Sequence, residues 1–259
     1  MKKCPQCFYT RSWKLADGRH KCRQCGHRYR VRTVWQASRL PERTKQLLLE
    51  RFVLGVPVYR QRFLADASLA AVERFYRLAR ACCAYEELLR EPFEGHLECD
   101  ETTFGGRKKG KRGWGTAGKI IVFGVLKRNG TVQVFPISRR SGQKVLRFIQ
   151  AHTRPGSLYY TDDWQAYVAL AVRGDYITVH KQDGVPKGRD HINGIEGFWS
   201  YAKHWLYPYR GVPRKFFHLY LGEVCYRFNH RHENLKPPVL SLMKHLNYND
   251  IRPLLVRIR

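Results

Sequence analysis

The spacing of apolar residues changes once along the chain, from a helical to a strand-like period. Between Leu40 and Leu89 apolar residues recur every three or four positions, which is the period of amphipathic helices. A break at Gly55-Val56-Pro57 and a capping serine at Ser68 divide this stretch into three helices. Residues 40–91 are therefore expected to form a helical region that resembles a helix-turn-helix, although a plain three-helix spacer has the same pattern.

After Glu91-Pro92 the pattern becomes that of β-strands, and residues 93–235 are expected to form a second domain. The candidate strands are 96–100, 120–127, 132–137, 158–161 and 176–180. The dipeptide Asn129-Gly130 is typical of a hairpin turn, and residues 141–152 have a helical period. Three antiparallel strands, a helix and a further strand give the order of an RNase H-like core. The predicted fold class is thus α+β or α/β, with a mixed five-stranded sheet and helices.

Two more amphipathic helices are expected after this core. They cover residues 213–229 and 239–246, and we expect both to close over the sheet. Residues 236–259 then form a C-terminal helical tail with a basic end.

Four cysteines occur in two close pairs near the start of the chain. The pairs are Cys4-Pro-Gln-Cys7 and Cys22-Arg-Gln-Cys25. Two thiolate pairs at this spacing are typical ligands of one structural, tetrahedral Zn²⁺. Residues 1–32 are therefore expected to form a zinc ribbon, with turns at Gly18 and Gly26.

The other cysteines are predicted to be ordinary or buried thiols, because they have no metal-binding spacing: Cys82, Cys83, Cys99 and Cys225. A chain this long and basic does not resemble a secreted disulfide scaffold, so we expect a reducing, cytoplasmic compartment.

Charge adds a class of partner to this picture. The chain has 48 Lys and Arg against 21 Asp and Glu, a formal net charge of +27. The cations occur in every segment and alternate with aromatic residues, which favours nucleic acid over a merely solvated surface. No apolar run reaches the roughly 18 residues needed to span a bilayer, so no membrane partner is expected.

Three of the scarce acidic residues hold positions that indicate chemistry. Asp100 and Asp162 come at the ends of candidate strands, and Glu196 comes early in a candidate helix. Such carboxylates can converge on one sheet edge and bind two Mg²⁺ ions for phosphoryl transfer. Each also has a structural explanation: Asp100 as a turn residue, Asp162 or Asp163 as a helix cap, and Glu196 as a capping-box partner of Asn193. Adjacent strand residues point to opposite faces, so only one of Asp162 and Asp163 can face the ions.

Three segments around these acids resemble bacterial insertion-sequence transposases of the DDE type, in the subgroup with an N-terminal zinc ribbon. The segments are Asp100-Glu-Thr-Thr-Phe-Gly-Gly, Tyr160-Thr-Asp-Asp-Trp-Gln-Ala-Tyr167 and His191-Ile-Asn-Gly-Ile-Glu-Gly-Phe-Trp-Ser-Tyr-Ala-Lys203. The resemblance implies that Asp100, Asp162 and Glu196 are the catalytic ligands of two Mg²⁺ ions, with Mn²⁺ as a substitute. Water or a DNA 3′-hydroxyl then attacks a phosphodiester in line, with no protein-linked intermediate.

Candidate DNA-binding residues fall in three places. Lys203 lies two helical turns after Glu196, where such enzymes often hold a basic residue against DNA, although a solvent-facing lysine is the simpler explanation. Residues 107–119 form a cationic, glycine-containing loop suited to a phosphate backbone, or a disordered surface loop, with Arg107, Lys108, Lys109, Lys111, Arg112 and Lys119. Arg74, Arg77 and Arg80 give the third helix of the helical region a basic balance.

The resulting hypothesis is a DNA transposase. Its ribbon and helical region bind the terminal inverted repeats of an insertion sequence, and its acids catalyse Mg²⁺-dependent strand cleavage and strand transfer. We expect it to bind double-stranded DNA, both element ends and target, as a homodimer or larger multimer near the bacterial nucleoid. Two alternatives remain: an RNase H-like nuclease or resolvase without strand transfer, and a non-catalytic zinc-ribbon regulator.

Overall fold

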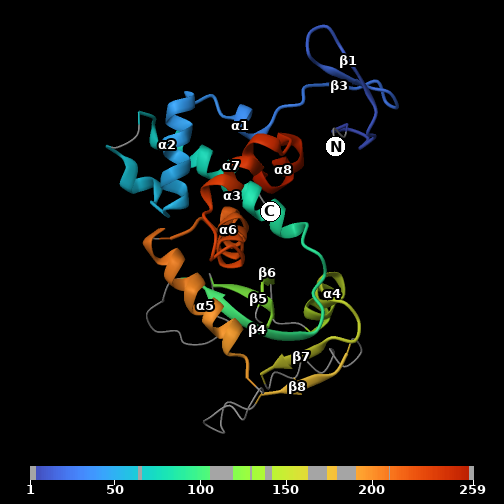
Figure 1. Cartoon of the computed structure of the whole chain (residues 1–259), viewed down its shortest axis with the longest axis vertical. Coiled ribbons are helices and arrows are strands. Elements are labelled where there is room, and N and C mark those ends of the chain that lie inside the picture. Colours follow the sequence, from blue (N-terminus) through green and yellow to red (C-terminus); the bar gives the residue numbers. More distant parts are fainter. Residues whose placement is uncertain are drawn as a thin grey trace. The chain divides into compact units, whose positions relative to one another are not determined.

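The computed structural model describes residues 4–63, 66–105, 119–128, 130–137, 142–162, 174–179, 191–209 and 211–256. The chain divides into two compact units (Figure 1). One, here called the sheet unit, is Glu86–His232. The other, here called the terminal unit, combines Met1–Tyr85 with Glu233–Arg259, so that both ends of the chain contribute to one unit.

A mixed five-stranded sheet forms the centre of the sheet unit. Its strand order is β6-β5-β4-β7-β8, with β4 antiparallel to β5, β5 antiparallel to β6, and β7 parallel to both β4 and β8. The strands are β4 His96–Phe104, β5 Ile120–Lys127, β6 Val132–Ile137, β7 Leu158–Thr161 and β8 Tyr176–Thr178. The predicted fold class, including the five-stranded mixed sheet, is confirmed.

The first three strands form an antiparallel meander. The N–H of Lys127 donates to the carbonyl of Thr131 at 2.9 Å, which closes the predicted hairpin around Gly130. β4 is four residues longer than predicted, because its pairing with β5 continues as far as Phe104 opposite Ile120. Asp100 therefore lies in the middle of a strand, and its interpretation as a turn residue is wrong.

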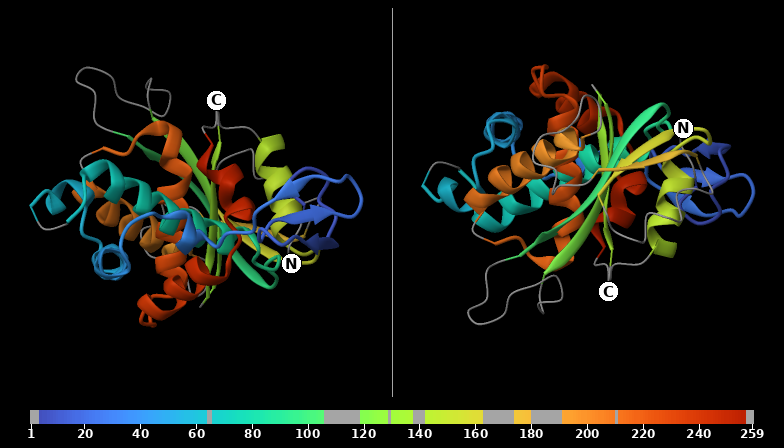
Figure 2. Two further views of the ribbon diagram at one scale, coloured as in Figure 1. Left: turned by 90° about the horizontal axis from the view of Figure 1, so that it is seen from above. Right: turned by 90° about the horizontal axis from the view of Figure 1, so that it is seen from below.

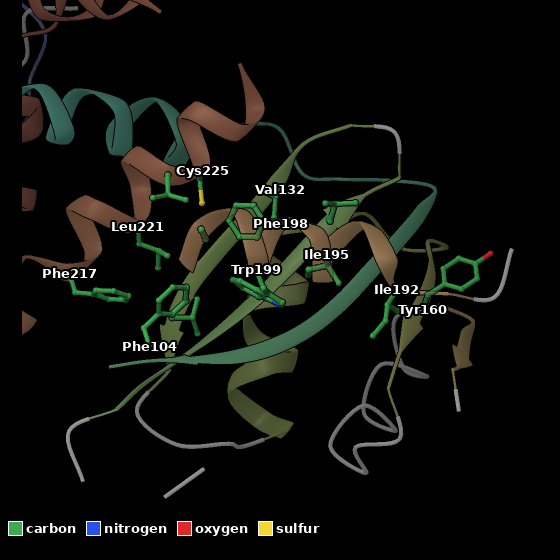
Figure 3. Packing of buried hydrophobic residues seen from close by; sticks show 14 residues of the cluster. Phe104, Val132, Tyr160, Ile192, Ile195, Phe198, Trp199, Phe217, Leu221 and Cys225 are labelled. Carbon is green, nitrogen blue, oxygen red and sulfur yellow. The ribbon is translucent and has the colours of Figure 1, made fainter. Parts of the chain in front are cut away.

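Helices cover both faces of this sheet (Figure 2). α4 Gly142–His152 packs on one face with Val145 and Ile149, while α5 Asn193–Leu206 and α6 Phe217–Asn229 pack on the other (Figure 3). Two 3₁₀ turns, η4 Tyr207–Tyr209 and η5 Arg214–Phe216, lie between α5 and α6. A strand buried on both sides is apolar at successive positions, which explains the run Ile-Ile-Val-Phe-Gly-Val-Leu of β5.

The terminal unit begins with a three-stranded antiparallel ribbon. Its strands are β1 Ser12–Lys14, β2 His20–Cys22 and β3 Arg28–Tyr29. Gly18 and Gly26 have φ values of +75° and +71°, which L side chains rarely adopt. Both glycines thus form the tight turns expected from the sequence.

The helical region follows the ribbon. It contains α1 Val34–Ala37, α2 Glu42–Val53, a 3₁₀ turn η1 Val58–Gln61 and α3 Leu69–Leu88. The Ser68 hydroxyl accepts a hydrogen bond from the N–H of Ala71 at 3.3 Å and caps α3, as predicted. The expected short middle helix is only the single turn η1, which begins directly after Pro57. The helix-turn-helix interpretation of residues 40–91 stays a prediction.

Two C-terminal helices complete the terminal unit, α7 Lys236–His245 and α8 Tyr248–Leu255. α7 packs on α1 and α2, so the expectation that it closes over the sheet is wrong, whereas α6 does cover β6. The N–H of Val34 donates to the carbonyl of Leu246 at 3.0 Å and helps hold the C-terminal segment in place. No helix in the described part of the chain is long and apolar enough to cross a membrane.

Candidate functional site

Asp100 is held by a hydrogen bond from α5. It lies buried on the β4 face that α5 covers, and the Nε1–H of Trp199 donates to its Oδ2 at 3.0 Å. The rings of Phe104 and Phe198 pack around this indole (Figure 3). A hydrogen bond to an ionised acceptor is stronger than one between neutral groups. This contact therefore fixes the orientation of the Asp100 carboxylate.

Gly124 makes room for that indole. It lies opposite Asp100 in the β4–β5 pairing. A Cβ atom at position 124 would lie 2.8 Å from Cζ2 and 2.9 Å from Cη2 of Trp199. A glycine in the middle of an apolar strand is a known sign of close approach by another group, and here the group is the ring that binds Asp100.

Asp162 directly follows the last residue of β7. β7 pairs in parallel with β4, with Tyr160 opposite Glu98. Paired positions on neighbouring strands, about 4.8 Å apart, point to the same face of a sheet. Tyr160 therefore shares the α5 face with Glu98, and Asp162 follows it by two residues, while Asp163 lies outside the described residues.

Glu196 is an exposed residue in the first turn of α5. It precedes Trp199 by three positions, so it lies about one helical turn from the residue that contacts Asp100. Carboxylates are the ligands that a hard cation prefers. Among the described residues, only the four N-terminal cysteines have ligand atoms that all lie within 4.8 Å of one another. Asp100, Asp162 and Glu196, all described residues, therefore do not form such a cluster in this structure.

Glu98, which the sequence reasoning missed, connects β4 to the start of α5. Its side chain is 2 % exposed, and its Oε2 accepts from the backbone N–H of Ile195 at 2.9 Å. Its Oε1 accepts from Arg128 Nε at 3.0 Å, and the Nδ1 atom of His191 lies 3.7 Å from the same oxygen. A carboxylate at a helix N-terminus satisfies unpaired N–H groups and stabilises the helix dipole.

This contact corrects an expectation about Asn193. The position before α5 is Ile192, and no side chain at that position caps the helix, so Asn193 is neither its cap nor a capping-box partner of Glu196. The carboxylate of Glu98, 97 residues before Ile195 in sequence, takes the place of a local cap. Gly194 allows the approach, since a Cβ there would lie 2.8 Å from Glu98 Oε2.

Arg128 links the same network to β7. Its guanidinium lies 3.5 Å from the ring centroid of Tyr160, whose hydroxyl is 3.0 Å from His96 Nδ1. Its Nη2 also donates to the carbonyl of His191. β4, β7 and the start of α5 are thus joined on the face that carries the acids.

The four N-terminal cysteines form a second site, in the ribbon. The Sγ atoms of Cys4 and Cys25 lie 3.6 Å apart, and those of Cys7 and Cys22 lie 3.5 Å apart. Thiolates about 2.3 Å from a tetrahedral zinc ion are separated by about 3.8 Å, so the cluster fits one such ion. Burial raises the pKa of Cys22, but backbone N–H groups of Cys25 and Gln24 outweigh it and lower that pKa to about 7. Hydrogen bonds therefore favour the thiolate form of Cys22. At Cys7 a hydrogen bond from the backbone N–H of Tyr9 is outweighed by burial and by hydrogen bonds with the other three thiols, which raise the pKa of Cys7 to about 12.

Comparison with known proteins decides the family. The sequence model of the ISXO2-like transposase domain matches residues 92–229, which is more than half of the chain and includes all three acids. The chain belongs to the ISXO2-like transposase family. The resemblance to insertion-sequence transposases of the DDE type, expected from the sequence, is thereby confirmed.

The chain is similar to two curated relatives whose names agree with the assignment, and to a chain in one solved structure. An uncharacterized transposase-like protein of Haemophilus influenzae is 34 % identical over 86 residues, 33 % of this chain and 70 % of the relative. A protein in the transposable element ISH50 of Halobacterium salinarum is 27 % identical over 221 residues, covering 76 % of this chain and 73 % of the relative. A chain of a simian T-cell lymphotropic virus intasome matches with a TM-score of 0.34 and 15 % identity; the match covers 70 % of this chain and 64 % of that one.

The predicted DNA-binding residues of this transposase have different surroundings. Arg74 and Lys203 are exposed, and Arg77 Nε donates to Glu73 at 3.2 Å. Arg80 is wholly buried between the rings of Phe52 and Tyr76, so its expected contribution to a DNA-binding surface is wrong. Lys119 is half-buried next to β5, whereas Arg107, Lys108, Lys109, Lys111 and Arg112 lie outside the described residues.

The remaining cysteines of the transposase are buried free thiols, as predicted: Cys82, Cys83, Cys99 and Cys225. Burial, and then the charges of Asp100 and Glu98, raise the pKa of Cys99 well above its usual value. This buried thiol, which neighbours Asp100 in sequence, is therefore held in its neutral, unreactive form.

Proposed function

We propose that this transposase cuts DNA strands at the ends of a mobile element and joins them to target DNA. Asp100, Asp162 and Glu196 are the proposed catalytic residues and the proposed ligands of two Mg²⁺ ions, which Mn²⁺ can replace. The observation that carries this proposal is the contact between the elements of the acids. Trp199 of α5, three residues after Glu196, donates to Asp100 of β4, and β7, which Asp162 directly follows, pairs with β4.

The chain's own residues orient the reaction. Trp199 holds one oxygen of Asp100, and Glu98 holds the first turn of the helix that carries Glu196. When bound, two divalent ions supply activation of the attacking oxygen and charge stabilisation of the leaving one. A strand or helix that holds each ligand rigidly favours such chemistry, because small misplacements of reacting groups lower the reaction rate strongly.

The remaining parts of the proposal concern recognition. Cys4, Cys7, Cys22 and Cys25 hold one structural Zn²⁺, and the ribbon and helical region bind double-stranded DNA at the element ends. Work on two ends calls for a homodimer or larger multimer. The net charge of +27 supports a polyanionic partner, because Lys and Arg contacts to phosphates provide most of the non-specific affinity for DNA.

A strand-transfer assay tests the function. The purified protein is incubated with Mg²⁺, a supercoiled target plasmid and a duplex that carries an end of its own element with a free 3′-hydroxyl. Joined product that requires Mg²⁺ is expected. Cleavage without joining would instead indicate a nuclease or resolvase, and tight binding without either product would indicate a regulator.

A further inference from the structure

Both ends of the chain line one cationic cleft in the terminal unit. The cleft has a volume of about 760 Å³. Arg30 and Arg32, which follow the last ribbon strand, lie on it together with Arg252 of α8. All three arginines are exposed, so their guanidinium groups are accessible to a ligand.

Backbone pairing holds this cleft together. The N–H of Tyr248 donates to the carbonyl of Arg32 at 2.8 Å, and Thr33 forms an antiparallel bridge with Asn247. The Asn247 side chain also accepts from the N–H of Asn249 at 2.9 Å and caps α8. α8 is therefore fixed to the chain that leaves the ribbon, although more than 200 residues separate them in sequence.

The lining has the chemistry of an anion-binding surface. Besides the arginines it contains His27, Tyr29 and Asn249, and none of the described residues that line it is acidic. The buried hydroxyl of Tyr29 has no hydrogen-bond partner in the described part of the chain. Buried polar groups are nearly always satisfied, so a hydroxyl without a partner beside such a cleft points to a ligand or bound water.

We propose that this cleft binds the sugar-phosphate backbone of duplex DNA, with α8 as one wall and the base of the ribbon as the other. The C-terminal tail is then part of the DNA-recognition module, and not an appendage of the catalytic domain. Arginine forks match phosphate oxygens in pairs, and neutral side-chain donors also contact the backbone in protein–DNA complexes. The proposal rests on the proposed function only in that the chain acts on DNA.

Binding of fluorescent duplexes to the full-length, zinc-loaded protein tests the cleft. One duplex carries the end of the protein's own element and the other a scrambled sequence of equal length. Arg252→Gln and Arg30→Gln each remove one cation from opposite walls. Lys244→Gln is the matched control, because Lys244 is an exposed cation of α7 in the same unit and does not line the cleft.

Each cleft variant is expected to weaken binding to both duplexes by the same factor. The slope of log affinity against log salt should fall by about 0.9 for each single variant and by about twice that for the double variant. Lys244→Gln should leave the slope unchanged. Cleft variants that match the wild type or the Lys244 control in affinity and in salt slope would overturn the proposal. Circular dichroism spectra that match across all the variants verify that the substitutions leave the fold intact.

Strand transfer by the wild type, measured on the same duplexes, separates the two proposals. If the wild type binds and joins DNA while the cleft variants keep the full salt slope, the cleft proposal fails and the proposed function stands. If the wild type binds with the predicted loss of slope in the variants but makes no product, the transposase chemistry fails and the cleft proposal stands. If the wild type binds neither duplex, both fail.

Discussion

Trp199 on α5 donates a hydrogen bond to Asp100 on β4, across 3.0 Å. The bond joins the strand of one proposed catalytic acid to the helix of another, three residues after Glu196. It depends in turn on Gly124, because any larger residue there would meet the indole. The orientation of Asp100 in this transposase is therefore set by two residues, Trp199 and Gly124, that carry no metal-binding group.

Trp199→Phe tests the hydrogen bond while keeping an aromatic ring. Loss of a hydrogen bond to a charged acceptor should lower the free energy of unfolding by about 1.5–3 kcal/mol. The turnover rate of DNA cleavage should also fall, with little change in the Michaelis constant for DNA. Trp205→Phe is the matched control, because Trp205 is on the same helix and its Nε1 has no hydrogen-bond partner among the described residues. Equal turnover in the two variants would argue against an orienting role for Trp199.

Gly124→Ala should destabilise the sheet unit. The added methyl group would overlap Trp199, and overpacking of this kind costs about 1–3 kcal/mol. Gly197→Ala in α5 makes the same chemical change where no atom lies within 4 Å, and replacing glycine in a helix should add up to about 1 kcal/mol. Urea denaturation of both variants measures the difference, and an unchanged midpoint for Gly124→Ala would contradict the packing described.

Glu98→Gln should lower the free energy of unfolding by more than its conservative nature implies. It leaves the guanidinium of Arg128, whose side chain is 15 % exposed, without its carboxylate partner. Breaking a buried ion pair costs about 3–5 kcal/mol. Glu94→Gln is the control, because Glu94 and Arg154 form an exposed pair at 3.3 Å, and such pairs contribute at most about 1 kcal/mol. Thermal or urea unfolding that gives similar losses for both variants would show that Glu98 does not hold the start of α5.

Thiol reactivity tests the cysteine cluster. In zinc-loaded protein no cysteine should react rapidly with a thiol reagent, since four are metal ligands and the other four are buried. A strong chelator should expose the cluster, Cys4, Cys7, Cys22 and Cys25, and denaturant should then expose the rest. Titration with Ellman's reagent counts the thiols at each step. Rapid reaction of the four cluster thiols before chelation would contradict a zinc site.

Local sequence patterns predicted most of the sheet unit. Strand-like apolar segments and the Asn129-Gly130 turn identified β5, β6 and β7 with the bounds that the structure shows, because these signals come from neighbouring residues. The start of α5 was predicted with the wrong cap for the same reason. Its capping carboxylate, Glu98, comes from another strand, and no local pattern contains that information.

Burial was the second source of error. Arg80 has the spacing and charge of a DNA-binding residue, yet it lies between two aromatic rings of the helical region. α7 has an apolar face that suits the sheet as well as it suits α1 and α2, and only the tertiary structure shows which of them it covers. Gly124 was the one local signal of the Asp100–Trp199 contact, since a glycine inside a central strand often marks the close approach of another group.

The most direct test of the proposed catalytic centre is single-turnover, Mg²⁺-dependent cleavage of a duplex that carries the end of the protein's own element. Asp100→Asn, Asp162→Asn and Glu196→Gln should each lower the rate by at least about 100-fold, the scale of losing one key electrostatic group, while DNA binding is retained. Asp163→Asn, which makes the same change at the adjacent position, should keep most of the wild-type rate. Wild-type cleavage by any of the three triad variants would contradict the account.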